Sequence, residues 1–385
     1  MTRWDAEVAV IGLGAWGSAA LWQLAARGTD VIGVERFVPG HALGSSHGGS
    51  RMFRVTCLEH PGLVPLARRS LELWRELEAQ SGESLLHQGG GLLIGPPEGQ
   101  IAGGTLRAAA EHGIDVQPMS AEELRAAHPR HAHVPEHHIG VLEPGAGITR
   151  PEGSVRAAVR LARSAGAQVI TGTQVTALTS CDGGVEVRTG ARTLRVRQAV
   201  VTVGAWLPTL VPGLPLTTTR MPITWFRPAA DGGTGARDAF GLERFPVFMR
   251  ELDSGAVLWG SGRENGFDVK LGLEYAGAGF RPMDPEDTDR SVGADDWSDL
   301  SALLAEHIPG LERAPARAAV CMFSATPDGQ FVIGRPGGDP RMVVAGGCNA
   351  HGSKHAPGIG EALADLVTEG AMRVPLDFTD PDRFR

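Results

Sequence analysis

Hydrophobic residues near the amino terminus change their spacing twice. The run EVAVI is continuously apolar, which is typical of a buried parallel strand. AWGSAALWQLAARG has helical composition and ends at Gly28, and DVIGVE is a second apolar run that ends in Glu35. The order strand, helix, strand predicts a βαβ unit at the start of the chain.

Further stretches carry patterns of the same kind. RMVVAGGCNAHGSKHAPGIGEALADLVTEG predicts a strand, a glycine-rich turn and a helix that begins near Pro357. QAVVTVGAWLPTL predicts a strand that ends in a turn at Gly204. VPLARRSLELWRELEAQSG has apolar residues at helical spacing with charges between them, which predicts an amphipathic packing helix. RPAADGGTGARDAFG predicts a mobile surface loop.

Composition and charge exclude several classes of protein. The net charge of -8, without a basic block, argues against a nucleic-acid partner and against an anionic membrane surface. The uncharged run from Val8 to Ala26 divides into strand, turn and helix, and the MTRWDAE before it lacks the basic region of a secretory signal. The four cysteines are irregularly spaced, which fits a reducing compartment. We therefore expect a cytoplasmic protein with no membrane partner.

The first turn carries a dinucleotide-binding pattern. Gly12, Gly14 and Gly17 have G-x-G-x-x-G spacing between the first strand and the first helix. The first glycine permits the tight turn, the second lets the backbone approach a pyrophosphate, and the third lets helix and strand pack closely. Glu35, at the end of the second strand, is placed to accept hydrogen bonds from an adenosine ribose. The motif alone does not distinguish NAD from FAD.

The segment after Glu35 favours a flavin. RFVPGHALGSSHGGSRMFRVTC is a long loop of small residues that ends in Arg51 and Arg54, whereas a nicotinamide dehydrogenase usually continues directly to another helix. Small residues suit close wrapping around a large flat cofactor. The glycine-rich turn before Pro357 adds a second anion-binding helix start.

These residues resemble the monomeric sarcosine oxidase and N-methyltryptophan oxidase family of FAD-dependent amine oxidases. The similarity runs nearly from end to end, and its most specific stretches are SSHGGSRMFR, VPLARRSLELWRELE, VTVGAW, VKLG, AAVCMFSATPDGQFVIG and AHGSKHAPGIGEAL. The resemblance implies that Cys321 forms a thioether to a methyl carbon of the flavin ring. It implies that Lys354 lies at the substrate and pyrimidine edge of the flavin. For Cys57, Cys181 and Cys348 we expect no role beyond apolar filling.

The resemblance implies an α/β fold with a discontinuous cofactor domain, because the cofactor motifs span the whole sequence. We expect a Rossmann-type, glutathione-reductase-like FAD-binding domain over residues 1–91, 147–219 and 317–385. A mostly antiparallel β-sheet substrate domain, over residues 92–146 and 220–316, is interleaved with it. The family is monomeric, so a monomer is expected. The resemblance also assigns further residues to the cofactor site: Arg36, Ser46, His47, Arg51, Val175, Gly204, Trp206, Ala350, Gly352 and Ser353.

The resemblance also implies catalytic roles. Arg54 and Lys354 match the pair that binds the substrate carboxylate, which implies an amino-acid-like substrate. Lys270 matches the lysine that activates oxygen on the flavin face opposite the substrate, which implies an oxidase that releases hydrogen peroxide. His351 matches a histidine beside the flavin, where a structural role and a catalytic one are both open.

Several departures from the family lie where the substrate should bind. Glu274 stands in place of a histidine, and Phe323 and Trp259 stand in place of tyrosines. Ala350 and Ser353 replace a glycine and a phenylalanine. A carboxyl at position 274 could orient a protonated amine, or act as a base if burial raises its pKa. We therefore doubt sarcosine itself and expect a bulkier, cyclic or N-alkylated amino acid.

One histidine-rich stretch lies outside these motifs. HPRHAHVPEHH, from His128 to His138, contains prolines that predict a loop, and the resemblance places it in a connector away from the flavin. We expect no metal cofactor here and at most adventitious binding of nickel or zinc.

Two alternatives remain beside the oxidase. An NAD(P)H-dependent flavin monooxygenase or a flavin dehydrogenase, acting on a biosynthetic intermediate, shares the first motif. A monooxygenase usually carries a late G-D element, and GGCNAHGSK is not one. A nucleotide-binding sensor with the same fold is disfavoured because Cys321, Lys270 and Lys354 are all present.

Overall fold

The predicted βαβ unit forms at the amino terminus. The computed structural model describes residues 4–229, 238–275 and 281–385. Strands β1 (Ala6–Ile11) and β2 (Val31–Val34) pair in parallel, and helix α1 (Ala15–Ala26) connects them. Ten consecutive residues of α1, from Trp16 to Ala25, are buried, because α5 (Pro151–Ser164) and α9 (Ala356–Thr368) pack against it. The helix is apolar all round for this reason.

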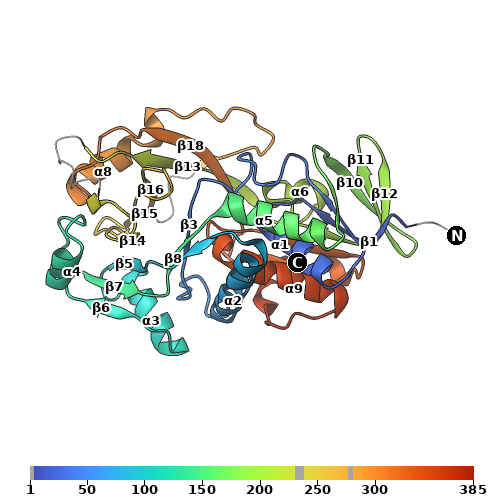
Figure 1. Cartoon of the computed structure of the whole chain (residues 1–385), viewed down its shortest axis with the longest axis horizontal. Coiled ribbons are helices and arrows are strands. Elements are labelled where there is room, and N and C mark those ends of the chain that lie inside the picture. Colours follow the sequence, from blue (N-terminus) through green and yellow to red (C-terminus); the bar gives the residue numbers. More distant parts are fainter. Residues whose placement is uncertain (1–3, 230–237, 276–280) are drawn as a thin grey trace.

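These first strands belong to an eight-stranded sheet. Its order is β10-β11-β12-β1-β2-β9. In addition, β20 pairs with β12, and β19 pairs with β20. The central pairings are parallel, and β10 and β11 form an antiparallel hairpin at one edge. Helices α2 (Leu63–Ser81), α5 and α9 lie beside this sheet in Figure 1. The other strands are β9 (Gln168–Ile170), β10 (Val175–Cys181), β11 (Gly184–Thr189), β12 (Thr193–Val201), β19 (Val332–Gly334) and β20 (Met342–Gly346).

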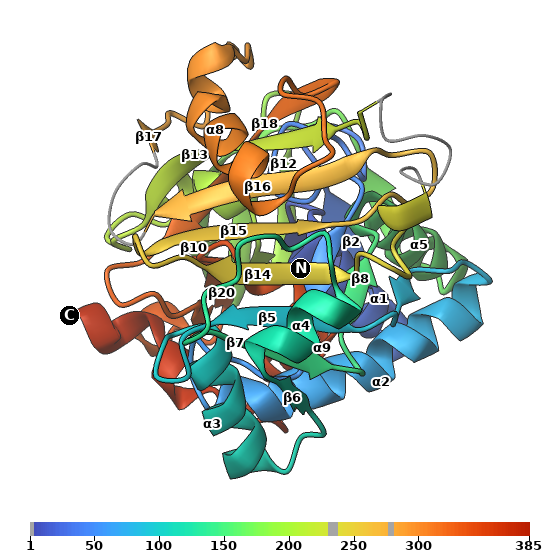
Figure 2. The same ribbon diagram turned by 90° about the vertical axis from the view of Figure 1, so that its left-hand side faces the viewer.

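The second large sheet has nine strands in the order β17-β13-β16-β15-β14-β5-β7-β6, with β18 paired to β13. All its pairings are antiparallel except that of β14 with β5. Figure 2 shows its strands edge to edge, with α4 and α8 nearby. Its strands are β5 (Gly91–Gly95), β6 (Gln117–Met119), β7 (Ile139–Glu143), β13 (Thr217–Phe226), β14 (Val247–Glu251), β15 (Ala256–Ser261), β16 (Val269–Tyr275), β17 (Arg281–Pro282) and β18 (Arg317–Ala325). Its helices are α3 (Ala102–His112), α4 (Ala121–Ala127) and α8 (Ser298–His307).

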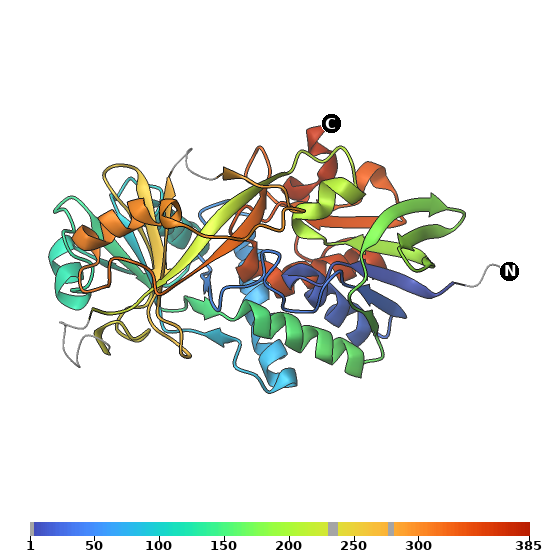
Figure 3. The same ribbon diagram turned by 90° about the horizontal axis from the view of Figure 1, so that it is seen from above.

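The expected fold class is confirmed: a mostly parallel α/β layer is interleaved with a mostly antiparallel sheet, and the two lie at opposite ends of the long axis (Figures 1 and 3). One strand differs from the expected division of the chain. β18, which carries Cys321, pairs along its whole length with β13, so it belongs to the antiparallel sheet although it lies after residue 316. β13 itself begins three residues before the expected boundary at Arg220.

A small sheet connects the two large ones. β3 (Arg51–Phe53) and β4 (Leu86–His87) pair antiparallel with β8 (Gly147–Thr149). The strand β3, which begins at Arg51, thus extends the loop after β2 and lies between the two large sheets in Figure 1.

Two further expectations concern the surface and the membrane. Most of the expected loop over 227–241 lies outside the described residues, which resume at Asp238. Among the helices that the structure describes, none combines the length and the apolar character that crossing a bilayer requires.

Candidate active site

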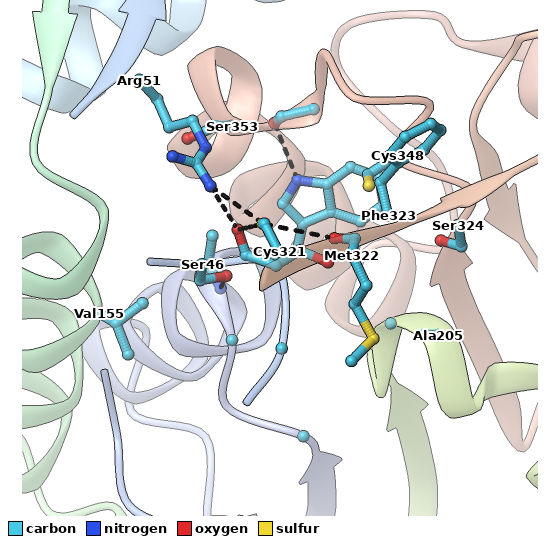
Figure 4. A pocket seen from close by; sticks show the side chains of 18 of the residues that line it. Ser46, Arg51, Val155, Ala205, Cys321, Met322, Phe323, Ser324, Cys348 and Ser353 are labelled. Carbon is cyan, nitrogen blue, oxygen red and sulfur yellow. Dashed lines mark hydrogen bonds between the residues drawn. The ribbon is translucent and has the colours of Figure 1, made fainter. Parts of the chain in front are cut away.

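A cavity of about 340 Å³ is lined by residues from both large sheets. Figure 4 shows Arg51, Ser46 and Cys321 around the same space. Gly17, His47, Arg54, His351 and Lys354 are expected site residues that do not line the cavity. The expected residues that line it are Gly12, Gly14, Glu35, Arg36, Ser46, Arg51, Val175, Gly204, Trp206, Lys270, Glu274, Cys321, Ala350, Gly352 and Ser353.

The glycine-rich turn leaves no room for side chains. Gly12 has a φ of +85°, and a Cβ there would lie 2.9 Å from the carbonyl oxygen of Thr202. A Cβ on Gly17 would lie 1.9 Å from the carbonyl oxygen of Gly12, so the helix could not approach the strand. Gly17 therefore acts beneath the cavity wall, and the backbone of Gly12 and Gly14 forms the wall itself.

Glu35 presents a fixed carboxylate to the cavity. Its side chain is buried, and its oxygens accept hydrogen bonds from the backbone N–H groups of Leu13 (2.7 Å) and Phe37 (2.8 Å). Burial opposes ionisation, but the interactions with His41 and these N–H groups outweigh it and lower the pKa of Glu35. The ionised carboxylate retains free lone pairs for a ribose hydroxyl.

The loop after β2 closes over the start of α1. The hydroxyl of Ser46 accepts a hydrogen bond from the backbone N–H of Ala15 at 3.0 Å, which caps the helix. Arg36 makes a two-pronged ion pair with Glu286 (2.6 and 2.8 Å), and its guanidinium lies 5.6 Å from the ring of Trp206. The three side chains form one rim of the cavity.

Cys321 lies beside Arg51 at the cavity wall. The thiol is buried on β18, and Nη2 of Arg51 lies 3.3 Å from its sulfur (Figure 4). Arg51 is held in turn by the carbonyl oxygens of Ser50 (3.0 Å) and Ser45 (3.2 Å). Arg51 thus places a fixed positive charge next to the Cys321 sulfur.

Lys270 reaches the opposite side of the same loop. Its ammonium is buried and donates to the carbonyl oxygens of Gly48 (3.0 Å) and Ser50 (2.6 Å). Burial, followed by the charge of Arg51, lowers the pKa of Lys270 well below its usual value. Glu152, at the start of α5, accepts from the N–H groups of Gly48 and Gly49 and so fixes the turn that holds the lysine.

Arg54 and Lys354 meet on a carboxylate that the sequence analysis did not identify. Nη2 of Arg54 lies 2.8 Å and Nζ of Lys354 lies 3.0 Å from the same oxygen of Glu59. Burial opposes ionisation of Glu59, but the charges of Arg54 and Lys354 hold its pKa well below the usual range. No local pattern marks Glu59, because its partners come together only through the fold; the nearest signal is an acid five residues after Arg54.

Two predicted histidines are kept neutral by burial. His351 lies near this cluster and stacks on Phe331, with ring centroids 4.6 Å apart, and burial lowers its pKa to about 4 although Glu59 opposes the shift. His47 belongs to the loop after β2, where burial and the charge of Arg51 lower its pKa to about 3. Within the described part of the chain, the buried Nε2 of His47 has no hydrogen-bond partner.

Glu274 lines the cavity together with apolar side chains. It lies on β16 opposite Val257 of β15, and burial, with the charge of Glu59, raises its pKa. Met249, Trp259 and Phe323 line the same cavity. The indole N–H of Trp259 is buried and has no hydrogen-bond partner among the described residues. This part of the cavity therefore combines an apolar wall with one carboxyl of raised pKa and one indole N–H without a partner among the described residues.

The turn before α9 has an uncommon backbone. Asn349 and Ala350 have φ values of +45° and +61°, which residues other than glycine rarely adopt. The side chain of Asn349 stabilises the turn by accepting from the N–H of Thr326 (2.9 Å) and donating to the carbonyl of Gly347 (2.6 Å). Ala350 thus occupies a conformation that favours glycine, the residue expected there from the family. Backbone strain of this kind concentrates at functional sites.

The residues fit an FAD molecule by their chemistry. The cradle at Gly12 and Gly17 is one that any Cβ would fill, Glu35 offers an ionised carboxylate, and Cys321 offers a thiol beside a cation. These features respectively suit a pyrophosphate, a ribose and a reactive ring substituent.

The whole chain matches known flavoproteins. Residues 7–366 match the family model described as FAD dependent oxidoreductase (DAO), so the chain belongs to this family. It is 35% identical over 380 residues to the monomeric sarcosine oxidase of Streptomyces avermitilis, covering 98% of this chain and 97% of the relative. It is 29% identical over 383 residues to the N-methyl-L-tryptophan oxidase of Yersinia pestis, covering 99% and 100%. The expected family and enzyme class are confirmed: the chain is an FAD-dependent oxidoreductase related to amine oxidases.

Solved structures share the fold. NikD, an unusual amino acid oxidase essential for nikkomycin biosynthesis, superposes with a TM-score of 0.85 at 24% identity and 98% coverage of both chains. Glycine oxidase from Geobacillus kaustophilus superposes with a TM-score of 0.79 at 22% identity, again with 98% coverage of both chains. At these identities the likeness establishes the fold alone.

Proposed function

We propose that this enzyme oxidises a secondary or N-alkylated amino acid to an imine and transfers the electrons to oxygen. One observation carries the proposal: Arg54 and Lys354 both lie within 3.0 Å of one carboxylate oxygen. Two cations that converge on a single oxygen can hold the carboxylate of a substrate in the same way. An amine without a carboxylate would have no anionic group to offer these two cations.

The residues of the chain have separate roles in this reaction. FAD, when bound, accepts a hydride equivalent from the carbon next to nitrogen and passes two electrons on to oxygen. Arg54 and Lys354 bind and orient the substrate carboxylate, and Glu274 faces the amine. Lys270 stabilises the negative charge that develops on oxygen. Cys321 holds the cofactor covalently through a thioether at the ring methyl carbon.

The reaction balances without a further reactant. The amine loses two electrons and two protons as its C–N single bond becomes C=N, and dioxygen gains both electrons and both protons as hydrogen peroxide. Glu274 is the side chain best suited to accept or donate the amine proton, because burial raises its pKa toward neutral pH.

The substrate pocket favours a side chain larger than that of sarcosine. Met249, Trp259 and Phe323 provide apolar surface, and the Trp259 N–H provides a donor that a small substrate would leave unpaired. Relatives named for sarcosine and for N-methyl-L-tryptophan show that related chains accept both small and large N-methyl amino acids. We therefore place the substrate among bulkier, cyclic or N-alkylated amino acids.

Peroxide release in air from the purified yellow protein tests the proposal. The panel contains sarcosine, N-methyl aromatic amino acids, proline, pipecolate and the matching amines without a carboxylate. We expect peroxide only from carboxylated secondary amines. Activity confined to amines without a carboxylate contradicts the roles of Arg54 and Lys354. Reduction of the flavin by a substrate, without peroxide, favours the alternative of a flavin dehydrogenase with another electron acceptor. A sedimentation measurement on the same sample tests the expected monomer.

A further inference from the structure

Two adjacent histidines at the end of the histidine-rich stretch face one carboxylate. Nε2 of His137 and Nε2 of His138 lie 3.0 Å and 2.7 Å from the same oxygen of Asp253. The three potential ligand atoms all lie within 4.8 Å of one another. None of these residues lines the cavity described above, so the cluster is separate from the candidate active site.

The local backbone explains why neighbouring side chains converge. His138 donates its backbone N–H to the carbonyl of Pro135 at 3.0 Å, so the chain turns just before β7. In an extended strand, successive side chains would point to opposite faces. The turn instead sets the two imidazole rings 4.6 Å apart and perpendicular to each other. Asp253 comes from the turn between β14 and β15, far away in sequence.

The donor set is that of a borderline transition metal. Two imidazole nitrogens and one carboxylate suit zinc, nickel or copper, whereas calcium and magnesium prefer oxygen ligands alone.

Only small movements separate this arrangement from metal coordination. Zinc bonds to histidine nitrogen and aspartate oxygen are about 2.0–2.2 Å long, which places tetrahedral ligand atoms about 3.3 Å apart. The side chains of His137 and Asp253 are 62% and 59% exposed and free to adjust, whereas that of His138 is 1% exposed and fixed. The exposed side leaves room for a water as the fourth ligand.

We infer that His137, His138 and Asp253 form a binding site for one zinc-class metal ion. To bind the ion through Nε2, each neutral imidazole carries its single proton on Nδ1, so no proton is lost from the ring. The bound ion links the 128–138 connector to the β14–β15 hairpin, whose strands carry Met249 and Trp259 to the cavity wall. The ion stabilises this sheet, because a ligand that binds only the folded chain raises its stability by mass action.

Calorimetric titration of the untagged, FAD-loaded protein with Zn²⁺, after removal of metals with EDTA, tests the site. We expect one ion per chain, with a dissociation constant in the micromolar range, and no heat with Ca²⁺. His137→Ala and Asp253→Asn should each weaken binding about tenfold or more, since each removes one ligand of three. Both positions are exposed, so the fold should tolerate the substitutions.

A matched variant distinguishes a built site from a generally metal-binding loop. His133 is an exposed histidine in the same loop with a φ of +49°, so His133→Asn keeps a residue that tolerates this conformation. We expect this variant to bind Zn²⁺ like the parent and to show the same Zn²⁺-dependent rise in melting temperature, which the other two variants should lose. Absence of binding, binding unchanged in both ligand variants, or equal loss in His133→Asn overturns the inference.

Discussion

Nζ of Lys354 lies 3.0 Å from a carboxylate oxygen of Glu59, although the two residues are 295 positions apart in the chain. Arg54 contacts the same oxygen, so two cations share one internal carboxylate. Their charges overcome the cost of burial and keep the pKa of Glu59 well below its usual range. Glu59 therefore remains ionised and competes with any substrate carboxylate for the same two partners.

Replacing Glu59 by glutamine should strengthen the binding of carboxylated substrates. The amide keeps the shape of the side chain but removes the competing charge, and a gain of about 1.4 kcal/mol corresponds to a tenfold lower KM. Steady-state kinetics with the best substrate of the panel measures the change. Glu72→Gln is the control, because Glu72 is an exposed acid paired with Arg69 away from the cavity. An unchanged KM in Glu59→Gln would show that Glu59 does not compete with the substrate, and a higher KM would show that it helps to bind substrate instead.

The covalent attachment can be tested with two cysteines of one cavity. Cys321 and Cys348 both line it, but Arg51 approaches only Cys321 among the contacts described for the two thiols, and burial raises the pKa of Cys348. We expect acid precipitation to leave yellow colour in the pellet for the parent and for Cys348→Ala, and in the supernatant for Cys321→Ala. Colour in the pellet of Cys321→Ala would place the linkage elsewhere.

Lys270 should control the reaction with oxygen but not the reaction with the amine. Lys270→Met removes the buried amino group and its hydrogen-bond donors, and loss of one such stabilising group typically costs about 10²–10³-fold in rate. Stopped-flow mixing of the photoreduced enzyme with oxygen measures this step without any substrate. Reduction by the amine under anaerobic conditions is the internal control, and it should change little. Equal slowing of both steps would indicate a structural role.

The contrast between Gly12 and Glu59 shows what the sequence could predict. Gly12, Gly14 and Gly17 act within one turn, so their spacing alone predicts the βαβ unit that the structure contains. The roles of Cys321 and Lys354 could be predicted only from family motifs. The fold then brings Cys321 next to Arg51. Glu59 could not be found in this way, because its role depends on partners that the fold brings together.

The sheet to which β18 belongs was difficult to predict for a similar reason. β18 follows the last segment of the antiparallel domain in sequence, and its apolar pattern would suit either sheet. Only its nine-residue register with β13 decides the question. The pairing of His137 and His138 with Asp253 likewise depends on a turn that brings two distant segments together.

Glu274 should determine the acid side of the pH–activity profile. Burial and the charge of Glu59 raise its pKa, which suits a group that exchanges a proton with the amine. We expect Glu274→Gln to lower kcat/KM about 10²-fold and to remove the ionisation of this carboxyl from the profile of kcat/KM against pH. Glu274→Asp is the matched variant and should keep that ionisation. A profile unchanged in Glu274→Gln would leave Glu274 as a side chain that only shapes the pocket.

Stability should fall as the pH is lowered from about 6.5 toward 4. The folded protein holds His351 neutral down to a pKa of about 4 and His47 down to about 3, whereas in the unfolded chain both titrate near 6.5. In this window the unfolded state binds more protons, so the free energy of unfolding decreases as the pH falls. Each histidine should contribute a loss of about 2 kcal/mol between pH 7.5 and 5.

Urea unfolding of the FAD-loaded protein at pH 7.5, 6.5 and 5 measures this dependence. His351→Gln removes one of the titrating groups, which also include the buried His131 and His355. Its loss of stability between pH 7.5 and 5 should therefore be smaller by about 2 kcal/mol. His137→Gln changes an exposed histidine and should keep the dependence of the parent. The carboxylates of Glu35 and Glu59 have lowered pKa values and so contribute below pH 4.5, outside this comparison. If the parent and His351→Gln showed the same dependence of unfolding free energy on pH, the pKa of His351 would not be lowered in the folded protein.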